Sequence, residues 1–152
     1  MIVKNEEKFL EQCLNSVKNI ADEIIIVDTG STDDTKKIAK KFNAKIFDFK
    51  WVDDFSAARN ESIRHTTKDW IFMLDADEVI AEEDLKKIKD AIENADVAGF
   101  AFEQRSYTIN FFEGAVKNES NFELVKYYQF YIRHFLVRLF KNGLGLHFKH
   151  RV

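Results

Sequence analysis

Trp70-Ile71-Phe72-Met73-Leu74-Asp75-Ala76-Asp77-Glu78 joins an apolar run directly to three closely spaced carboxylates. The apolar run predicts a strand that is buried on both faces. Carboxylates packed this closely repel one another, so we expect a cation among them; oxygen ligands of this kind suit Mg2+ or Mn2+ shared with a phosphate. The alternative is a strand end followed by the acidic first turn of a helix. An isolated Asp-x-Asp does not decide between the two.

The composition is that of an ordinary globular protein, with 152 residues, 45% hydrophobic and 32% charged. One domain is therefore expected. A formal charge of -3 offers no basic footprint, so direct binding of nucleic acid is not expected. The single Cys13 favours a cytoplasmic protein. We expect no transmembrane segment, because no apolar run approaches about 20 residues, and a peripheral position at a membrane face stays open.

Strand patterns alternate with helical patterns through the first two thirds of the chain. Asn5 is expected to be the N-cap of the first helix, and Ser31 with Asp34 to form a capping box before the second. The alternation predicts an α/β fold, with a mainly parallel sheet flanked by helices. Strands are expected at 2–3, 23–27, 45–49 and 70–74, and helices at 6–17, from about 35, at 55–66 and at 82–94.

Polar residues follow several of these expected strands. Asn5, Asp28 and Asp75 each lie just past the carboxyl end of one strand. Ligands of parallel α/β sheets bind outside these ends. The three positions together predict a binding site at one edge of the sheet.

The C-terminal third is rich in aromatic residues. We expect strands at 97–102, 134–140 and 146–148, added antiparallel to the parallel sheet, and a loop at 110–121. Aromatic residues in such a half-sheet mostly form core. The alternative is an acceptor surface or a dimer contact, for which the candidates near the loop are Phe111, Phe112, Tyr127 and Tyr128.

Four segments in order resemble the successive motifs of family 2 glycosyltransferases with the GT-A fold. They are Met1-Ile2-Val3-Lys4-Asn5-Glu6-Glu7, Ile26-Val27-Asp28-Thr29-Gly30-Ser31-Thr32-Asp33-Asp34-Thr35, Trp51-Val52-Asp53-Asp54-Phe55-Ser56-Ala57-Ala58-Arg59-Asn60 and Leu74-Asp75-Ala76-Asp77-Glu78. The branch with the most similar motifs includes bacterial lipopolysaccharide-core glucosyltransferases and peptide S-glycosyltransferases. The likeness covers residues 1 to 80 and, less specifically, 138–142.

The resemblance implies a GT-A (Rossmann-like) domain that transfers a sugar, with inversion, from a nucleotide-diphosphate donor such as a UDP-sugar. The acceptor would be a saccharide, a lipid or lipid-linked saccharide, or a peptide. In the DxD motif, Asp77 would bind Mn2+ or Mg2+, and Asp75 would contact the ribose, the metal, or both. Donor-binding residues carried over from the motifs are Val3, Asn5, Glu6, Asp28, Arg59, Asn60 and Asp75. One departure is Thr29, where many members have a second Asp.

The acceptor side is less determined. Glu103 is a candidate general base, with an exposed surface glutamate as the alternative. His147 or His150 could complete the metal shell, or be structural or exposed histidines of a strand. We expect residues 1–152 to be one domain trimmed at both ends, with a nucleotide-sugar-binding half at 1–96 and an incomplete acceptor-side half at 97–152.

Two other interpretations use the same motif. A haloacid-dehalogenase-type phosphatase also has an apolar strand followed by Asp-x-Asp, but normally in its first strand, and with a second acidic pair downstream that this chain lacks. A nucleotide- or metal-binding module without transfer activity is the non-enzymatic alternative.

Overall fold

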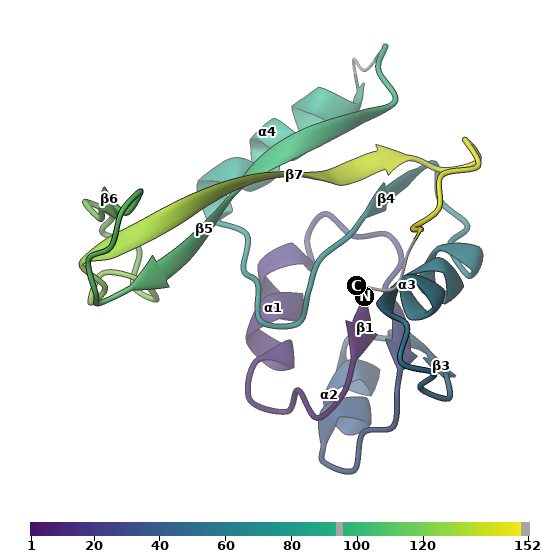
Figure 1. Ribbon diagram of the computed structural model, residues 1–152. Helices are drawn as coiled ribbons and strands as arrows, with labels where there is room; N and C mark the ends of the chain where they lie inside the picture. Colours follow the sequence, from purple (N-terminus) through teal and green to yellow (C-terminus); the bar gives the residue numbers. More distant parts are fainter. Residues whose placement is uncertain (94–95, 150–152) are drawn as a thin grey trace.

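The computed structural model describes residues 1–93 and 96–149, and its strands form two sheets (Figure 1). The first sheet is parallel, in the order β1-β2-β3. Its strands are β1 (Ile2–Val3), β2 (Ile25–Asp28) and β3 (Lys45–Asp48), and the helices that follow them are α1 (Leu10–Val17), α2 (Thr35–Lys41) and α3 (Phe55–Arg64).

Helices cover both faces of this sheet. Ile26 of β2 lies in a core cluster with Leu10 and Leu14 of α1 and Ile38 of α2. Successive strand residues point to opposite faces, so the buried neighbours of Ile26 in β2 face away from that cluster. The third helix, α3, contacts β1 and β2. The predicted parallel βαβ arrangement is confirmed in this part of the chain.

The second sheet is antiparallel. It contains β4 (Trp70–Phe72), β5 (Gly99–Thr108), β6 (Val116–Lys117) and β7 (Phe130–Lys141), in the order β4-β7-β5 with β6 paired to β7. Helix α4 (Glu82–Glu93) connects β4 to β5. The expected class, α/β with antiparallel strands added in the C-terminal third, is confirmed.

The strand at 70–74 was expected in the parallel sheet, and this expectation is wrong. Its residues 70–72 form β4, which pairs antiparallel with β7, so that Ile71 lies opposite Phe140. The apolar pattern predicted a buried strand correctly, but a buried run carries no information on the direction of its partner. That partner lies about 70 residues later in the chain.

Expectations for the C-terminal third are met in part. The strand at 97–102 continues to Thr108, and the one at 134–140 is part of the longer β7. No strand forms at 146–148 within the described residues. The ribbon of β5 and β7 projects from the rest of the fold (Figure 1).

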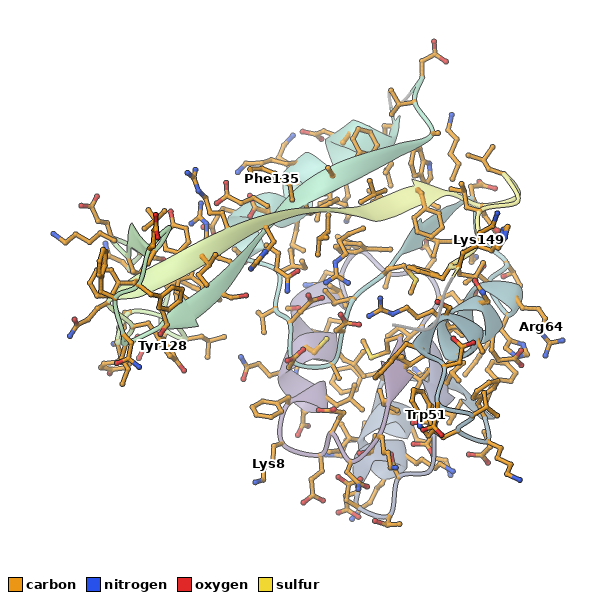
Figure 2. All side chains as sticks on the ribbon, viewed as in Figure 1. Lys8, Trp51, Arg64, Tyr128, Phe135 and Lys149 are labelled. Atoms are coloured by element: carbon orange, nitrogen blue, oxygen red, sulfur yellow. The ribbon has the colours of Figure 1, made fainter. Side chains whose placement is uncertain are left out.

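Five aromatic side chains of this ribbon and its loops are exposed, and the others are partly or fully buried. Phe111, Tyr127 and Phe135 are 71%, 75% and 68% exposed, and Tyr128 and Phe135 are labelled on the ribbon in Figure 2. Phe140, by contrast, is buried against Ile71 and Met73. The core interpretation is therefore wrong for Phe135, whereas the four candidates for an acceptor surface or dimer contact, Phe111, Phe112, Tyr127 and Tyr128, are all exposed.

A β-bulge lies where β5 and β7 leave the core. Phe100 pairs with Leu139, whereas the next residue, Ala101, pairs with Val137. Arg138 is thus the extra residue of β7. A bulge of this kind turns a side chain out of the regular alternation. No helix of the described chain is long and apolar enough to cross a membrane.

We predict that Gly99→Ala destabilises the fold near this bulge. A Cβ at position 99 would lie 2.7 Å from the carbonyl oxygen of Leu139, which is backbone and cannot move aside without disturbing the ladder. The free energy of unfolding, measured in urea, should fall by about 1–3 kcal/mol. Ala101→Val, at an exposed position of the same strand, should change it by less than about 0.5 kcal/mol. Equal stability of the Gly99 variant and the wild type would contradict the close approach.

Candidate functional site

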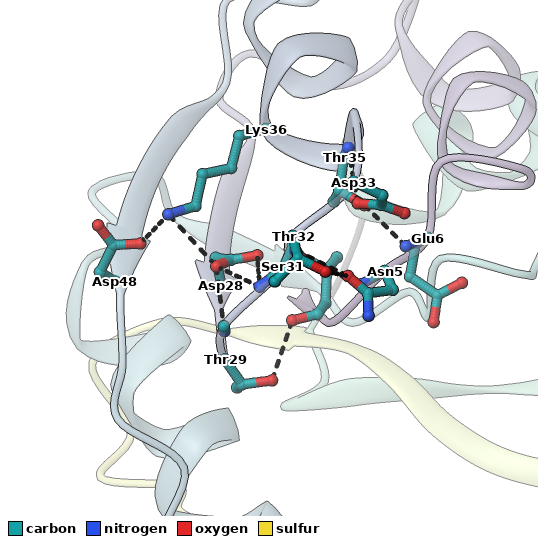
Figure 3. Close-up of polar contacts among 12 residues, drawn as sticks. Asn5, Glu6, Asp28, Thr29, Ser31, Thr32, Asp33, Thr35, Lys36 and Asp48 are labelled. Atoms are coloured by element: carbon teal, nitrogen blue, oxygen red, sulfur yellow. Dashed lines mark hydrogen bonds and ion pairs between the residues drawn. The ribbon is translucent and has the colours of Figure 1, made fainter.

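The loop after β1 is joined to the loop after β2 by hydrogen bonds (Figure 3). The Asn5 amide N–H donates to Ser31 Oγ at 2.9 Å, and the Thr32 N–H donates to Asn5 Oδ1 at 2.8 Å. The Glu6 N–H donates to Thr35 Oγ1 at 2.7 Å. These bonds join the carboxyl ends of β1 and β2 and the loops that follow them into one unit, which we call the first loop unit.

Two capping predictions are wrong for the same reason. Asn5 is not an N-cap: α1 begins at Leu10, and Asn5 has a left-handed backbone with φ of 57°. Ser31 and Asp34 form no capping box, since α2 has no side-chain cap and Ser31 binds Asn5 instead. Short polar side chains favour both caps and loop contacts, and here tertiary contacts take them.

Asp28 lies buried at the end of β2, in the middle of this unit. Its carboxylate accepts hydrogen bonds from the Gly30 and Ser31 N–H groups at 3.1 and 3.0 Å, and Lys36 Nζ lies 3.4 Å away. Lys36 also pairs with Asp48 of β3 (Figure 3). Burial raises the pKa of Asp28, but the Ser31 and Gly30 hydrogen bonds and the Lys36 charge outweigh it and lower the pKa overall.

We predict a pH-dependent loss of stability in Asp28→Asn. A lowered folded-state pKa means that the carboxylate stabilises the fold above its unfolded pKa, near 3.8, and that this contribution disappears as the pH falls through the folded value. At pH 7 the variant should lose about 1–3 kcal/mol in urea unfolding, because its amide N–H2 faces backbone donors.

The difference from wild type should shrink below about pH 4. Asp48→Asn removes the exposed partner of the same lysine and should cost less than about 1 kcal/mol at either pH. A difference for Asp28→Asn that stays constant down to pH 2 would rule out the ion-paired carboxylate.

The acidic segment after β4 forms a tight turn. The Asp75 N–H donates to Glu78 Oε2 at 2.8 Å, and the Glu78 N–H donates to the Asp75 carbonyl oxygen at 3.1 Å. The Cys13 thiol of α1 donates to the same carbonyl at 3.4 Å. Burial and the nearby Glu78 raise the pKa of Cys13 to about 12, so the thiol keeps its proton. Ala76 is buried in the core cluster with residues of α1 and α2, and this packing holds the turn in place.

Two arginines from other elements hold the Asp75 carboxylate. Arg59 Nη2, from α3, lies 3.3 Å from Oδ1, and Arg138 Nη1, from β7, lies 3.2 Å from Oδ2. Arg138 also donates to Glu78 Oε1 at 2.5 Å and to Gln104 Oε1 at 3.1 Å. Asp75 is therefore ion-paired on both sides.

Arg59 keeps one donor free. Its Nε is buried and has no hydrogen-bond partner among residues 1–93 and 96–149. The guanidinium carbon lies 5.4 Å from the centre of the Phe148 ring. A buried charged donor without a partner is costly, and a bound anion would satisfy it.

Asp77 differs from Asp75 in having no ion pair. Its side chain is exposed, and no described residue forms a hydrogen bond or ion pair with it. The charge of Asp77 also acts on Glu6. Burial, followed by the charges of Asp77 and Asp33, raises the pKa of Glu6. A cation at this point would relieve the repulsion between these carboxylates.

The carboxylates present fit a divalent metal ion that is shared with a phosphate. In the described part of the chain, no three His, Cys, Asp or Glu side chains form a complete metal cage. Mg2+ and similar hard cations commonly take one or two carboxylates and complete their shell with substrate phosphates and water. Asp77, with Asp75 beside it, supplies a donor set of that kind.

The structure brings together most, but not all, of the predicted residues. Val3 lies at the centre of the first loop unit, where its carbonyl oxygen accepts from the Thr29 N–H at 2.9 Å. Asn60 is engaged by the backbone of Phe148, donating to its carbonyl at 2.9 Å and accepting from its N–H at 2.8 Å. The residues predicted to bind the donor thus lie along the ends of β1, β2 and β4 and on α3.

The acceptor-side candidates lie apart from this group. Glu103 pairs with Arg105 at 2.7 Å, and strand alternation directs it away from the face on which Gln104 meets Arg138. His147 is exposed, with its ring nitrogen Nδ1 3.1 Å from the Gly145 carbonyl oxygen. His150 lies outside the described residues.

Sequence analysis missed Gln104 and gave no role to two other members of the site, Glu78 and Arg138, although both lie in segments of the family likeness. One signal was present, because Arg138 is a charge directly before the apolar pair Leu139-Phe140 of a strand. Its contacts depend on the bulge, which no pattern in the sequence indicates.

Comparison with known proteins identifies the family. Residues 1–148 match the family described as Glycosyl transferase family 2. The chain is 47% identical over 90 residues to the SPbeta prophage-derived glycosyltransferase SunS of Bacillus subtilis, covering 58% of this chain and 21% of that protein. It is 44% identical over 100 residues to the TPR repeat-containing protein Synpcc7942_0270 of Synechococcus elongatus, covering 66% and 25%. These matches span about a quarter or less of each relative's length.

Solved structures show the same fold. S. aureus TarS, residues 1–349, aligns with a TM-score of 0.55 at 22% identity, covering 80% of this chain and 38% of that one. Glucosyl-3-phosphoglycerate synthase from Mycobacterium tuberculosis, in complex with Mn2+ and UDP-glucose, aligns with a TM-score of 0.54 at 21% identity, covering 64% and 39%. At this identity the likeness concerns the fold.

Proposed function

The chain belongs to glycosyltransferase family 2, and from this membership we propose that it forms the donor-binding part of a metal-dependent, inverting glycosyltransferase. The proposed donor is a nucleotide-diphosphate sugar, with a UDP-sugar as the first choice. Family membership argues against the haloacid-dehalogenase-type phosphatase. We keep the proposed division into a donor half at 1–96 and an acceptor half at 97–152.

One observation carries the proposal. An exposed and unpaired carboxylate, Asp77, lies two residues from Asp75, which two arginines hold, and one of these arginines keeps a buried donor free. Carboxylates for a cation and guanidinium groups for an anion thus lie side by side. A metal–diphosphate pair needs both kinds of ligand at once.

The nucleoside would lie along the first loop unit. Val3, Asn5 and Glu6 follow β1, and Asp28 ends the neighbouring β2. In parallel α/β sheets such strand ends form the ligand crevice. Bonds between the two loops hold the backbone of this unit before any ligand arrives, which lowers the entropy cost of binding.

Support for the donor comes from proteins of the same fold. The aligned structures include the mycobacterial synthase in complex with Mn2+ and UDP-glucose and TarS in complex with UDP-GlcNAc. We extend the use of a UDP-sugar and of Mn2+ or Mg2+ to this chain as a proposal. The acceptor is proposed by class only: a saccharide, a lipid-linked saccharide or a peptide.

The proposed transfer reaction needs stabilisation of the leaving diphosphate and a base for the acceptor's proton. The bond between the sugar's anomeric carbon and the diphosphate oxygen breaks, a bond from the acceptor to the opposite face of that carbon forms, and the acceptor's proton passes to a base. A bound divalent cation would neutralise charge on the leaving diphosphate. Arg59 and Arg138 hold the carboxylate of Asp75 in place, and Arg59 offers its free Nε to the phosphates. Glu103 is proposed as the base from the sequence alone, because it pairs with Arg105 and points away from the face on which Gln104 meets Arg138.

We predict that Asp77→Ala abolishes the Mn2+ dependence of UDP binding. Wild type should bind UDP at least about tenfold more tightly with Mn2+ than with EDTA, since the metal links the carboxylate to the diphosphate, and the variant should show less than about a twofold difference. Isothermal titration calorimetry measures the UDP affinities of both proteins with Mn2+ and with EDTA. A thermal-shift screen of nucleotide diphosphates identifies the preferred nucleobase.

Asp22→Ala is the matched control, because Asp22 is an exposed aspartate outside the site. It should behave as wild type. Unchanged Mn2+-dependent binding in Asp77→Ala would refute the assignment of this residue. Hydrolysis of simple phosphomonoesters, without binding of UDP, would instead favour phosphatase chemistry.

A further inference from the structure

We infer that Arg138 couples metal binding to diphosphate binding, acting as a positioning residue for Asp75. This inference rests on the proposed function and adds a role that none of the sequence motifs assigned.

The backbone gives Arg138 an unusual position. It is the extra residue of the bulge between the pairs Phe100–Leu139 and Ala101–Val137. Bulges re-aim side chains, and this one directs a guanidinium from β7 to the turn that follows β4. The neighbouring Leu139 is buried, and β7 pairs with β4 itself, so the base of the side chain is fixed.

The guanidinium is held at three points. It reaches Asp75 Oδ2 at 3.2 Å, Glu78 Oε1 at 2.5 Å and Gln104 Oε1 at 3.1 Å. Its side chain is only 13% exposed, so these bonds form largely out of water. A guanidinium presents its donors in a rigid planar fork, whereas a lysine ammonium is a point charge whose donors have no such fixed arrangement.

This arrangement works against either ligand alone. A metal ion approaching Asp77 meets a second carboxylate, Asp75, which is already neutralised by Arg138 and Arg59. A diphosphate without a metal meets arginines already paired with Asp75, together with the negative charges of Asp77 and Glu6. A metal that also binds Asp75, or a diphosphate that takes more than the free Nε of Arg59, must therefore displace an existing ion pair.

Together, the two ligands allow an exchange of partners. The diphosphate gives the arginines an anion with several oxygens, which guanidinium groups bind well, and this releases Asp75 toward the cation. Each ligand thus makes room for the other. The result is a coupling free energy between the two sites, by which each ligand raises the affinity of the other equally.

The test is a binding cycle measured by calorimetry. Four affinities are needed for each protein: Mn2+ with and without UDP, and UDP with and without Mn2+. The coupling factor is the ratio of the affinities for Mn2+ with and without UDP. The variant is Arg138→Gln, and the matched control is Arg133→Gln, which removes an exposed arginine from the same strand.

For Arg138→Gln we expect Mn2+ alone to bind about fivefold more tightly, because a positive charge has left the cation's surroundings. The coupling factor should fall at least about fivefold. Arg133→Gln should match wild type within about twofold. Loss of a nearby positive charge tightens Mn2+ binding whatever the role of Arg138, so the fall in the coupling factor is the readout that separates coupling from a merely structural role. Mn2+ affinity and coupling within twofold of wild type would overturn the inference.

A second variant covers the case in which Arg138→Gln does not fold. Gln104→Ala removes one anchor of the guanidinium without changing any charge or touching a carboxylate. It should tighten the binding of Mn2+ alone, and lower the coupling factor, by about twofold to threefold. No change in either quantity would overturn the inference in that case.

The same measurements separate this inference from the proposed function. If wild type binds UDP with equal affinity in Mn2+ and in EDTA, the proposed function fails. If wild type shows Mn2+-dependent binding and the variants keep its full coupling factor, only the role of Arg138 fails.

Discussion

The ion pairs of Asp75 connect the two sheets of this protein. Arg59 reaches the carboxylate from the helix side of the parallel sheet, and Arg138 reaches it from the antiparallel sheet. Charges held partly out of water are costly when they lose a partner, so removing any one of the three leaves an uncompensated charge. The place of the acidic turn, and of the exposed Asp77 within it, therefore depends on both sheets at once.

The two parts of the site differ in how they are prepared. The loops after β1 and β2 are fixed by their own hydrogen bonds, around a buried and ion-paired Asp28. The acidic turn is held by charges that a metal and a diphosphate would compete for. A nucleoside would thus meet a formed surface, whereas its phosphates would meet groups that must change partners. This difference follows from hydrogen-bond and charge geometry.

The short motifs of the sequence contain the residues predicted to bind the donor, but they do not indicate which contacts join these residues. The carboxylates after the apolar strand, Asp28 at a strand end and Arg59 on the third helix could be found because each lies within a short contiguous motif. Asn5 was mistaken for a helix cap, because a short polar side chain serves a cap and a loop contact equally well. The class of fold followed from the alternation of strands and helices.

Long-range pairing could not be predicted in the same way. The antiparallel partner of β4 is β7, about 70 residues later in the chain. The contacts of Arg138 depend on its being the extra residue of the bulge in β7. Phe135 shows the same limit, since it was expected to be covered but is exposed. Burial depends on which elements meet, and composition does not contain that information.

The most direct test of the account is a structure of this chain with Mn2+ and UDP bound. The account predicts the metal about 2.0–2.2 Å from a carboxylate oxygen of Asp77, with the diphosphate beside Arg59 and the uridine along the ends of β1 and β2. A metal or nucleotide bound elsewhere, with Asp77 free and both ion pairs of Asp75 unchanged, would contradict it.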